Sequence, residues 1–289
     1  MYSKAILKRL LRCQRDEITE HHIYLRLARR QKSDVNRQVF QRLAAEERAH
    51  YEKWKSCTER EVSPDWIKVH GFLWISRVFG FTFGAKLLEK GEANAKEAYR
   101  SLALEVGHAE SIMREEEEHE TALLGMLDEE RLRYVGSIVL GLNDALVELT
   151  GALAGLTLVL QNTRLIAITG GITGIAAALS MAASEYLSTK AEGPNRHPIK
   201  AALYTGIAYV MTVILLILPY LWATRYTTAL LVTLVTALSI IALFNYYISV
   251  ARDQPFGKRF LEMSTLSLSV AGFSFLVGYA LRTLVGVDV

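Results

Sequence analysis

The chain has few cysteines and shows no secretory signal. Cys13 and Cys57 form neither a Cys-x-x-Cys pair nor any other zinc-type spacing. We therefore interpret both as small buried side chains in a reducing compartment. The first residues carry charges throughout and lack the uninterrupted apolar core of a signal peptide. We therefore expect the N-terminal part of the chain to stay in the cytoplasm.

Concentrated positive charge is also lacking. The net charge of +3 is spread along the chain and forms no basic stripe, so we expect no nucleic-acid partner. Acidic residues are scarce in one half only, because residues 1–130 hold 23 Asp and Glu while residues 131–289 hold 7. Six of the seven histidines also lie before residue 131. This split predicts a charged soluble domain at 1–130 and a membrane domain at 131–289.

Helical periodicity predicts an all-α soluble domain, a four-helix bundle. Apolar residues recur at helical spacing in four segments, residues 3–31, 34–60, 84–103 and 105–130. Ser63, followed by Pro64, is predicted to cap a further helix. Residues 64–83 are rich in aromatic side chains but interrupted by Lys68, His70 and Arg77, so they are too polar to span a bilayer. They are expected either to pack on the bundle or a dimer partner, or to lie on the membrane surface.

Five apolar runs follow residue 133, and each is long enough to cross a bilayer as a helix, which needs about 20 residues. They are residues 134–160, 165–188, 200–223, 227–250 and 263–284. An odd number of spans places the two ends of this domain on opposite sides of the membrane. Eight basic residues flank the spans on the side of the soluble domain and three on the other side. The positive-inside rule then predicts a cytoplasmic N-terminal domain and an outside C-terminus.

Metal-ligand residue types recur on the inward faces of the bundle helices. Glu47 and His50, and Glu116 and His119, are Glu-x-x-His pairs that share one helix face. The other two helices offer Glu17 and Glu92, each followed seven residues later by a tyrosine, Tyr24 or Tyr99. One glutamate from each of two helices, plus Glu-x-x-His from each of the other two, is the ligand set of a dinuclear carboxylate site. Such ligands suit iron or manganese.

At these residues the segment resembles the rubrerythrin and ferritin-like di-iron proteins over about residues 5–128. The resemblance implies a di-iron cofactor and oxidation of Fe(II) by oxygen or peroxide. The absence of a Cys-x-x-Cys rubredoxin module speaks against an electron-fed peroxidase cycle. Other acids of the bundle, including Glu20, are interpreted as surface charges, one of which could be an extra ligand.

The first two predicted spans also carry ligand-type side chains. Asp144 and Glu148 are four residues apart on one helix face, and so are Met181 and Glu185. An acid inside a span costs a few kcal/mol, so it normally faces a pathway or a partner. No Lys or Arg lies at the depth of Asp144, which leaves a cation or a proton as its partner. Core packing for Met181, and an interfacial position for Glu185, are the alternatives.

The stretches around these residues, Gly-Leu-Asn-Asp-Ala-Leu-Val-Glu and Ala-Leu-Ser-Met-Ala-Ala-Ser-Glu-Tyr-Leu-Ser, closely resemble the vacuolar iron transporter family. The resemblance covers about residues 131–287. It implies a homodimer that exports Fe(II), and often Mn(II), from the cytoplasm in exchange for protons. Asp144, Met181 and Glu185 would then line the pathway, with Glu148 nearby.

The long acidic insert that some members of that family carry between spans two and three is absent here. The order of parts resembles the membrane-bound ferritin proteins of prokaryotes, which implies a location in the cell membrane. The sequence thus predicts an iron exporter in which the bundle captures, senses or oxidises iron. The alternatives are a membrane-anchored ferroxidase or peroxide-scavenging enzyme, and a bundle that senses iron and gates a channel.

Overall fold

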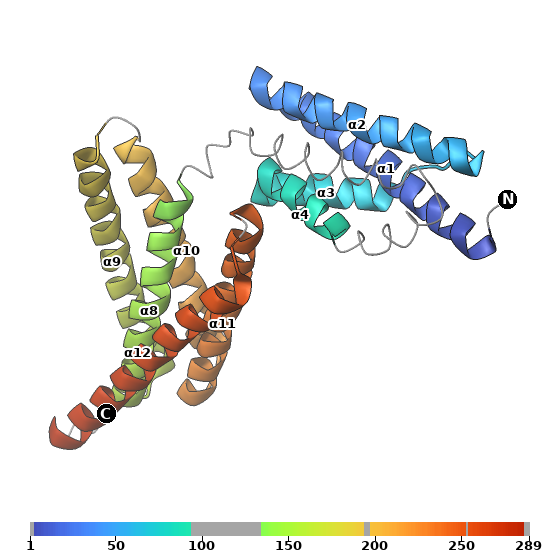
Figure 1. The fold of residues 1–289 in the computed structure, drawn as a ribbon. Coiled ribbons are helices and arrows are strands. Elements are labelled where there is room, and N and C mark those ends of the chain that lie inside the picture. Colours follow the sequence, from blue (N-terminus) through green and yellow to red (C-terminus); the bar gives the residue numbers. More distant parts are fainter. Residues whose placement is uncertain (1–2, 94–133, 194–196, 253, 286–289) are drawn as a thin grey trace. The chain divides into compact units, whose positions relative to one another are not determined.

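The computed structural model describes residues 3–93, 134–193, 197–252 and 254–285. The chain divides into two compact units, residues 1–130 and 131–289, each of which is described by itself. Every regular element among the described residues is an α-helix (Figure 1). The all-α prediction is therefore confirmed for these residues.

Unit 1 contains the helices α1 (Lys4–Arg30), α2 (Asp34–Thr58), α3 (Trp66–Phe79) and α4 (Phe81–Ala93). The first two begin after the serine N-caps Ser3 and Ser33, whose side-chain oxygens accept hydrogen bonds from backbone N–H groups. The expected cap at Ser63 is wrong. Asp65 caps α3 instead, because its carboxylate accepts hydrogen bonds from the backbone N–H groups of both Ile67 and Lys68.

An apolar core joins the four helices described in unit 1. Each helix contributes buried side chains, among them Tyr24 from α1, Phe40 from α2, Leu73 from α3 and Leu88 from α4. Helix α1 contacts both α2 and α3, and α3 contacts α4. Of the two expectations for residues 64–83, packing against the soluble unit is therefore confirmed for the inner face of α3.

An ion pair with a buried carboxylate also holds α3 to α1. Lys68 Nζ lies 2.8 Å from Glu20 Oε1 and 3.5 Å from Asp16 Oδ1. The side chain of Glu20 is only 2% exposed. The interpretation of Glu20 as a surface charge is therefore wrong, because a lysine 48 positions away compensates its burial.

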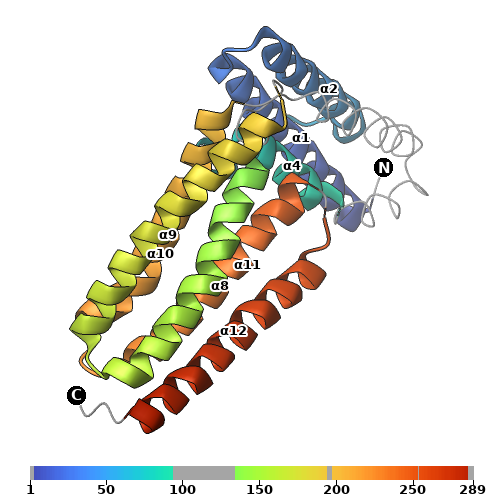
Figure 2. The same cartoon turned by 90° about the vertical axis from the view of Figure 1, so that its left-hand side faces the viewer.

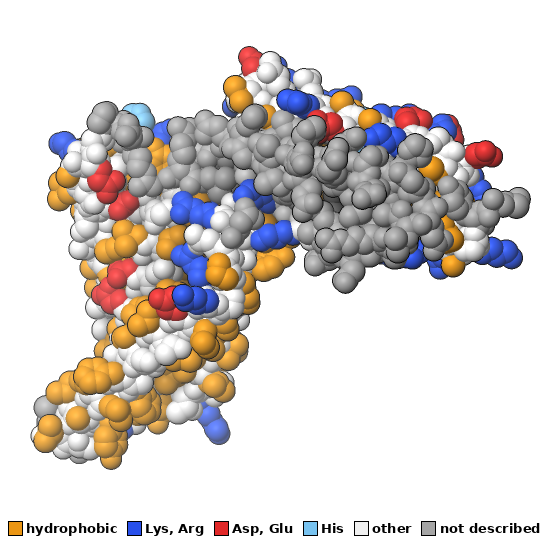
Figure 3. All heavy atoms as spheres, in the orientation of Figure 1, with side chains coloured by type: hydrophobic (Ala, Val, Ile, Leu, Met, Phe, Trp, Pro, Cys, Tyr) orange, Lys and Arg blue, Asp and Glu red, His pale blue; other side chains and the backbone are white. Residues whose placement is uncertain are grey.

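Unit 2 contains the helices α8 (Val135–Leu160), α9 (Thr163–Ala191), α10 (Pro198–Trp222), α11 (Tyr226–Ala251) and α12 (Phe256–Val285). All five are long and apolar enough to cross a membrane, as the sequence predicted. Large apolar side chains such as Ile172, Leu221 and Phe273 are exposed on their outer surfaces. Figure 3 shows such side chains over much of this unit. A protein surface of this kind faces lipid, so the chain is an integral membrane protein.

The helix that contains the last span, α12, begins at Phe256, before the apolar run predicted from residue 263. The prediction used apolarity, and Lys258, Arg259 and Glu262 interrupt the apolar run. Charged residues end a run that can lie in lipid, but they do not end a helix.

Close helix contacts hold unit 2 together. Helix α8 packs against α9, α10, α11 and α12 and lies next to α12 in Figure 2. At Gly278 a Cβ atom would lie only 2.6 Å from the carbonyl oxygen of Gly155, so the two backbones touch there. At Gly141 a Cβ atom would collide with the carbonyl oxygen of Thr205 on α10. Small residues at these crossings allow the contact that drives helix association in lipid.

Candidate metal sites

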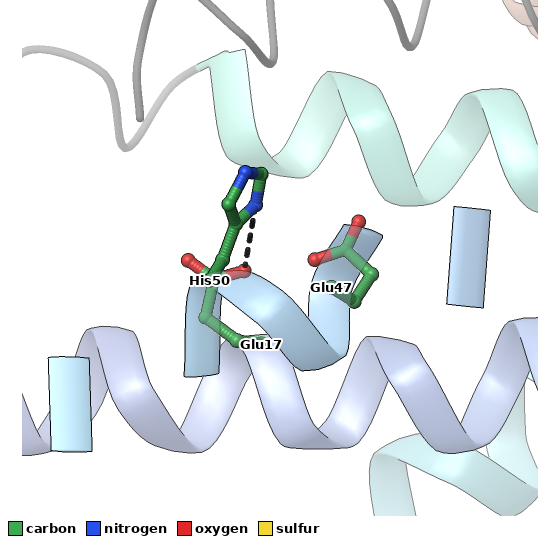
Figure 4. Close-up of side chains that lie close together, drawn as sticks. All are labelled: Glu17, Glu47 and His50. Carbon is green, nitrogen blue, oxygen red and sulfur yellow. Dashed lines mark ion pairs between the residues drawn. The ribbon is translucent and has the colours of Figure 1, made fainter. Parts of the chain in front are cut away.

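Three predicted bundle ligands lie together inside unit 1. Glu17 comes from α1, and Glu47 and His50 come from α2 (Figure 4). One ligand atom from each of the three lies within 4.8 Å of the other two. All three residues are buried, with exposed fractions of 3%, 5% and 6%. Nδ1 of His50 lies 3.7 Å from Oε2 of Glu17, which is longer than a hydrogen bond.

The helix geometry explains why these side chains meet. Glu47 and His50 are three residues apart and therefore project from the same face of α2 toward α1. Two polar contacts fix α1 against α2 on either side of the group. Thr58 donates a 2.7 Å hydrogen bond to the side chain of Gln14, and Nδ1 of His21 lies 2.6 Å from the carbonyl oxygen of Ala44.

Trp54 is part of the same site. Its Nε1 donates a 2.9 Å hydrogen bond to Oε1 of Glu17, and its side chain is completely buried. Burial on its own would raise the pKa of Glu17. The neighbouring side chains of His50 and Glu47 and the hydrogen bond from Trp54 outweigh burial and lower the pKa of Glu17. Glu17 is therefore held as a carboxylate, the form that binds a cation.

The donor set fits a divalent metal ion. Two carboxylates and one imidazole, all in a water-poor environment, are ligands that iron and manganese accept. Such a buried, partly neutralised group of acids is costly without a cation. The other predicted ligands, Glu116 and His119, and the side chain of Glu92 lie outside the described residues. The two-metal site and the four-helix ferritin-like bundle therefore stay predictions.

Helix α8 carries the predicted acids of unit 2 on one stripe. Ser137, Gly141, Asp144 and Glu148 follow each other at intervals of three or four residues, so they share a face of the helix. Asp144 is half-buried and Glu148 is exposed on the single chain.

Two hydrogen bonds connect these acids to neighbouring helices. Ser137 Oγ on α8 donates a 2.6 Å bond to Oε1 of Glu185 on α9. The hydroxyl of Tyr209 on α10, whose side chain is completely buried, donates a 2.9 Å bond to Oε2 of Glu148. Neither Ser137 nor Tyr209 is marked out in the sequence, since both are ordinary hydroxyl residues in apolar runs.

The predicted ligands follow the length of the α8–α9 pair. The two helices are antiparallel because only Gln161 and Asn162 connect them. Glu185 lies level with Ser137, and Met181 lies one turn further along, about 6 Å at 1.5 Å per residue. Asp144 and Glu148 follow on α8 in the same direction. Met181 also packs against the core of the unit, so packing and a ligand role are compatible.

This segment matches a known family. The family model described as the VIT family matches residues 135–197. The match spans α8, α9 and the loop to α10, and it contains Asp144, Glu148, Met181 and Glu185. No curated protein matches the chain. The chain is therefore similar to the VIT family over this segment, and its five apolar helices fit an integral membrane protein.

Proposed function

We propose that the protein is a metal-ion transporter that exports Fe(II), with Mn(II) as a second substrate, from the cytoplasm in exchange for protons. The observation that carries the proposal is the succession of oxygen and sulfur ligands on α8 and α9, inside the VIT-type segment. The ligands proposed for the pathway are Asp144, Glu148, Met181 and Glu185. Among these, the Met181 thioether favours Fe(II) over a hard ion such as Mg(II).

The exposure of Glu148 supports a homodimer. An ionised acid facing lipid near the middle of a span costs about 3 kcal/mol, so the α8 face that bears it needs cover. A second copy of the chain would bring the same acids to the other side of a shared pathway. This arrangement agrees with the homodimer that the resemblance implies.

Proton exchange follows from the same carboxylates. An acid inside an apolar span is neutralised either by a cation or by a proton, so arrival of one favours departure of the other. A proton taken up from the outside would release the metal ion from Asp144 or Glu185. The orientation proposed for this step has the N-terminal unit in the cytoplasm, as the distribution of basic residues favours.

The role proposed for unit 1 is capture or sensing of iron, with Glu17, Glu47 and His50 as one half of a di-iron site. Fe(II) bound there would be oxidised by oxygen or peroxide. The residues of the chain hold and orient the ion: His50 supplies a neutral nitrogen donor, and Trp54 fixes the carboxylate of Glu17. Burial of the group excludes water from it.

Flux measurements test the transport proposal. Reconstituted protein should move Fe(II) and Mn(II) across a proteoliposome membrane, and a pH gradient that is acidic on the receiving side should accelerate the flux. Absence of flux under both conditions would contradict it.

The second candidate is a membrane-anchored ferroxidase or peroxide scavenger, which the buried Glu17–Glu47–His50 group favours. Oxidation of Fe(II) without flux would support this enzyme. The Glu47→Ala variant separates the roles of the two units. Normal basal flux that no longer responds to iron concentration would assign unit 1 a regulatory role, whereas lost oxidation with normal flux would assign it a ferroxidase role.

A further inference from the structure

The outward face of α3 is apolar although α3 belongs to the charged unit of the chain. Four large apolar side chains lie exposed on it, Trp66, Ile67, Trp74 and Val78. Ile67 is 88% exposed and Trp74 is 63% exposed. The spacing from 67 to 74 to 78 is seven and then four residues, which places these side chains on one stripe of the helix. We refer to this stripe as the α3 face.

A basic pocket adjoins the α3 face. The pocket has a volume of about 470 Å³ and is lined by Arg26, Arg29, Arg30, His70, Leu73, Trp74 and Arg77. Among the described residues that line it are four arginines and no acid. The Arg26 guanidinium also lies over the ring of Trp66, 5.0 Å from its centroid. Indole rings and guanidinium groups are therefore interleaved along the junction of α1 and α3.

The inner side of α3 fixes which face points outward. Val69, Leu73 and Ser76 are buried against the rest of unit 1, and Lys68 pairs with the buried Glu20 of α1. Rotation of the helix to hide Ile67 and Trp74 would expose this inner stripe and break the ion pair. The exposed tryptophans and isoleucine are thus a fixed property of the surface.

We propose that the α3 face and its basic pocket bind the anionic lipid headgroups of the membrane that carries the five spans. Tryptophan and arginine together favour the interface of a bilayer, because the ring enters the headgroup region while the guanidinium binds phosphate. A protein partner would need matching acids as well as an apolar surface. The bilayer supplies both the negative charge and the apolar layer, and the spans of the same chain hold it close at high effective concentration. This docking would restrain unit 1 at the membrane.

A fluorescent reporter on the α3 face tests the proposal in the full chain. Gly71 is exposed on α3, and a Cβ atom there would meet nothing within 4 Å, so Gly71→Cys adds a labelling site without a clash. Cys13 and Cys57 are replaced by serine in the background. The control reporter is Ser56→Cys, at an exposed position of α2, a helix that packs on α1. The labelled protein is placed in nanodiscs that contain a headgroup-attached quencher, with or without phosphatidylglycerol.

The expected result is a several-fold stronger quenching at position 71 than at position 56 in anionic nanodiscs, weakened by salt. Each arginine near the surface contributes about fivefold to binding of an anionic membrane. The triple variant Arg29→Glu/Arg30→Glu/Arg77→Glu should therefore lose the effect. The matched control is Lys8→Glu/Arg12→Glu/Arg15→Glu, which changes the same number of exposed charges at the other end of α1. This control should keep the stronger quenching at position 71.

Two outcomes would overturn the proposal. Equal quenching at both positions, unchanged by the charge reversal, would show that the α3 face does not bind lipid. In neutral detergent micelles, the reporter at position 71 could instead be shielded and self-quenched between labelled copies. That result would show that the α3 face is a contact between two copies of the chain. Circular dichroism of each variant confirms that the helices are retained.

Discussion

Tyr209 on α10 donates a 2.9 Å hydrogen bond to Oε2 of Glu148 on α8, although the two residues are 61 positions apart. Tyr209 is completely buried, while Glu148 is exposed on the single chain. A rigid donor in the core thus fixes a carboxylate at the surface of the unit. In the proposed pathway, this bond orients the carboxylate toward a metal ion.

Tyr209→Phe should lower Fe(II) flux about tenfold without unfolding the protein, because a hydrogen bond to a charged group contributes about 1.5–3 kcal/mol. Proteoliposome flux measures the change. Tyr220→Phe is the matched control, since Tyr220 is equally buried on α10 but bonds to Thr157 Oγ1 at 2.7 Å, away from the proposed ligands. An equal loss of flux in both variants would assign Tyr209 a purely structural role.

Trp54→Phe should weaken metal binding at unit 1 about tenfold, because residues that orient a ligand typically contribute 10–100-fold to affinity. The variant keeps an aromatic ring in the core but removes the 2.9 Å bond to Glu17. Titration of the full-length protein with Mn(II), followed by electron paramagnetic resonance, measures the affinity. Tyr51→Phe is the control, because that hydroxyl accepts a bond only from the backbone N–H of Val62 among the contacts described for it. Unchanged affinity in Trp54→Phe would remove Trp54 from the site.

Gly278→Val should destabilise unit 2 by about 1–3 kcal/mol, the usual cost of overpacking a close contact. The added side chain would meet the backbone of Gly155, where α12 crosses α8. Gly272→Val on the same helix is the control, since a Cβ atom there meets nothing within 4 Å. Thermal unfolding in detergent compares the two. Equal melting temperatures would show that α8 and α12 tolerate separation.

Lys68→Met should loosen α3 at neutral pH by about 1–3 kcal/mol, because it removes the ion pair that Lys68 forms with the buried carboxylate of Glu20. Burial lowers the pKa of Lys68, but Glu20 and Asp16 outweigh it and raise the pKa above its ordinary value of 10.5. A lysine of this kind stabilises the fold fully below its unfolded pKa and loses the effect as pH rises through the folded value. The hydrogen-exchange protection of α3, after correction for intrinsic exchange rates, should therefore stay constant from pH 6 to 9. Lys53→Met serves as an unrelated lysine control, and equal protection of α3 in both variants would contradict the prediction.

The sequence predicted the helix face on which a residue lies better than the residue that it contacts on another helix. The stripe spacing of Glu17, Glu47 and His50 correctly placed them on facing sides of α1 and α2. Periodicity could not reveal that Glu20 pairs with Lys68, because that contact depends on how α3 folds back onto α1. Tyr209 was missed for the same reason, since a helix pattern contains no information about which neighbouring helix receives a side chain.

Helical periodicity predicted the boundaries of α1 and α2, whose expected ranges differ from the observed ones by at most two residues at either end. At α12 the prediction rested on apolarity, and the residues before 263 favour a helix but not lipid. The ligand roles in both units stay predictions that only measurements of metal binding and transport can test.

Fe(II) flux through the Asp144→Ala variant tests the central claim most directly. Asp144 lies half-buried on the α8 stripe within the segment that matches the VIT family. Proteoliposomes with an acidic receiving side should show Fe(II) transport for the unaltered protein. Asp144→Ala should abolish this transport while helix content and behaviour in detergent stay unchanged. Unchanged flux in a folded Asp144→Ala variant would contradict the proposed pathway.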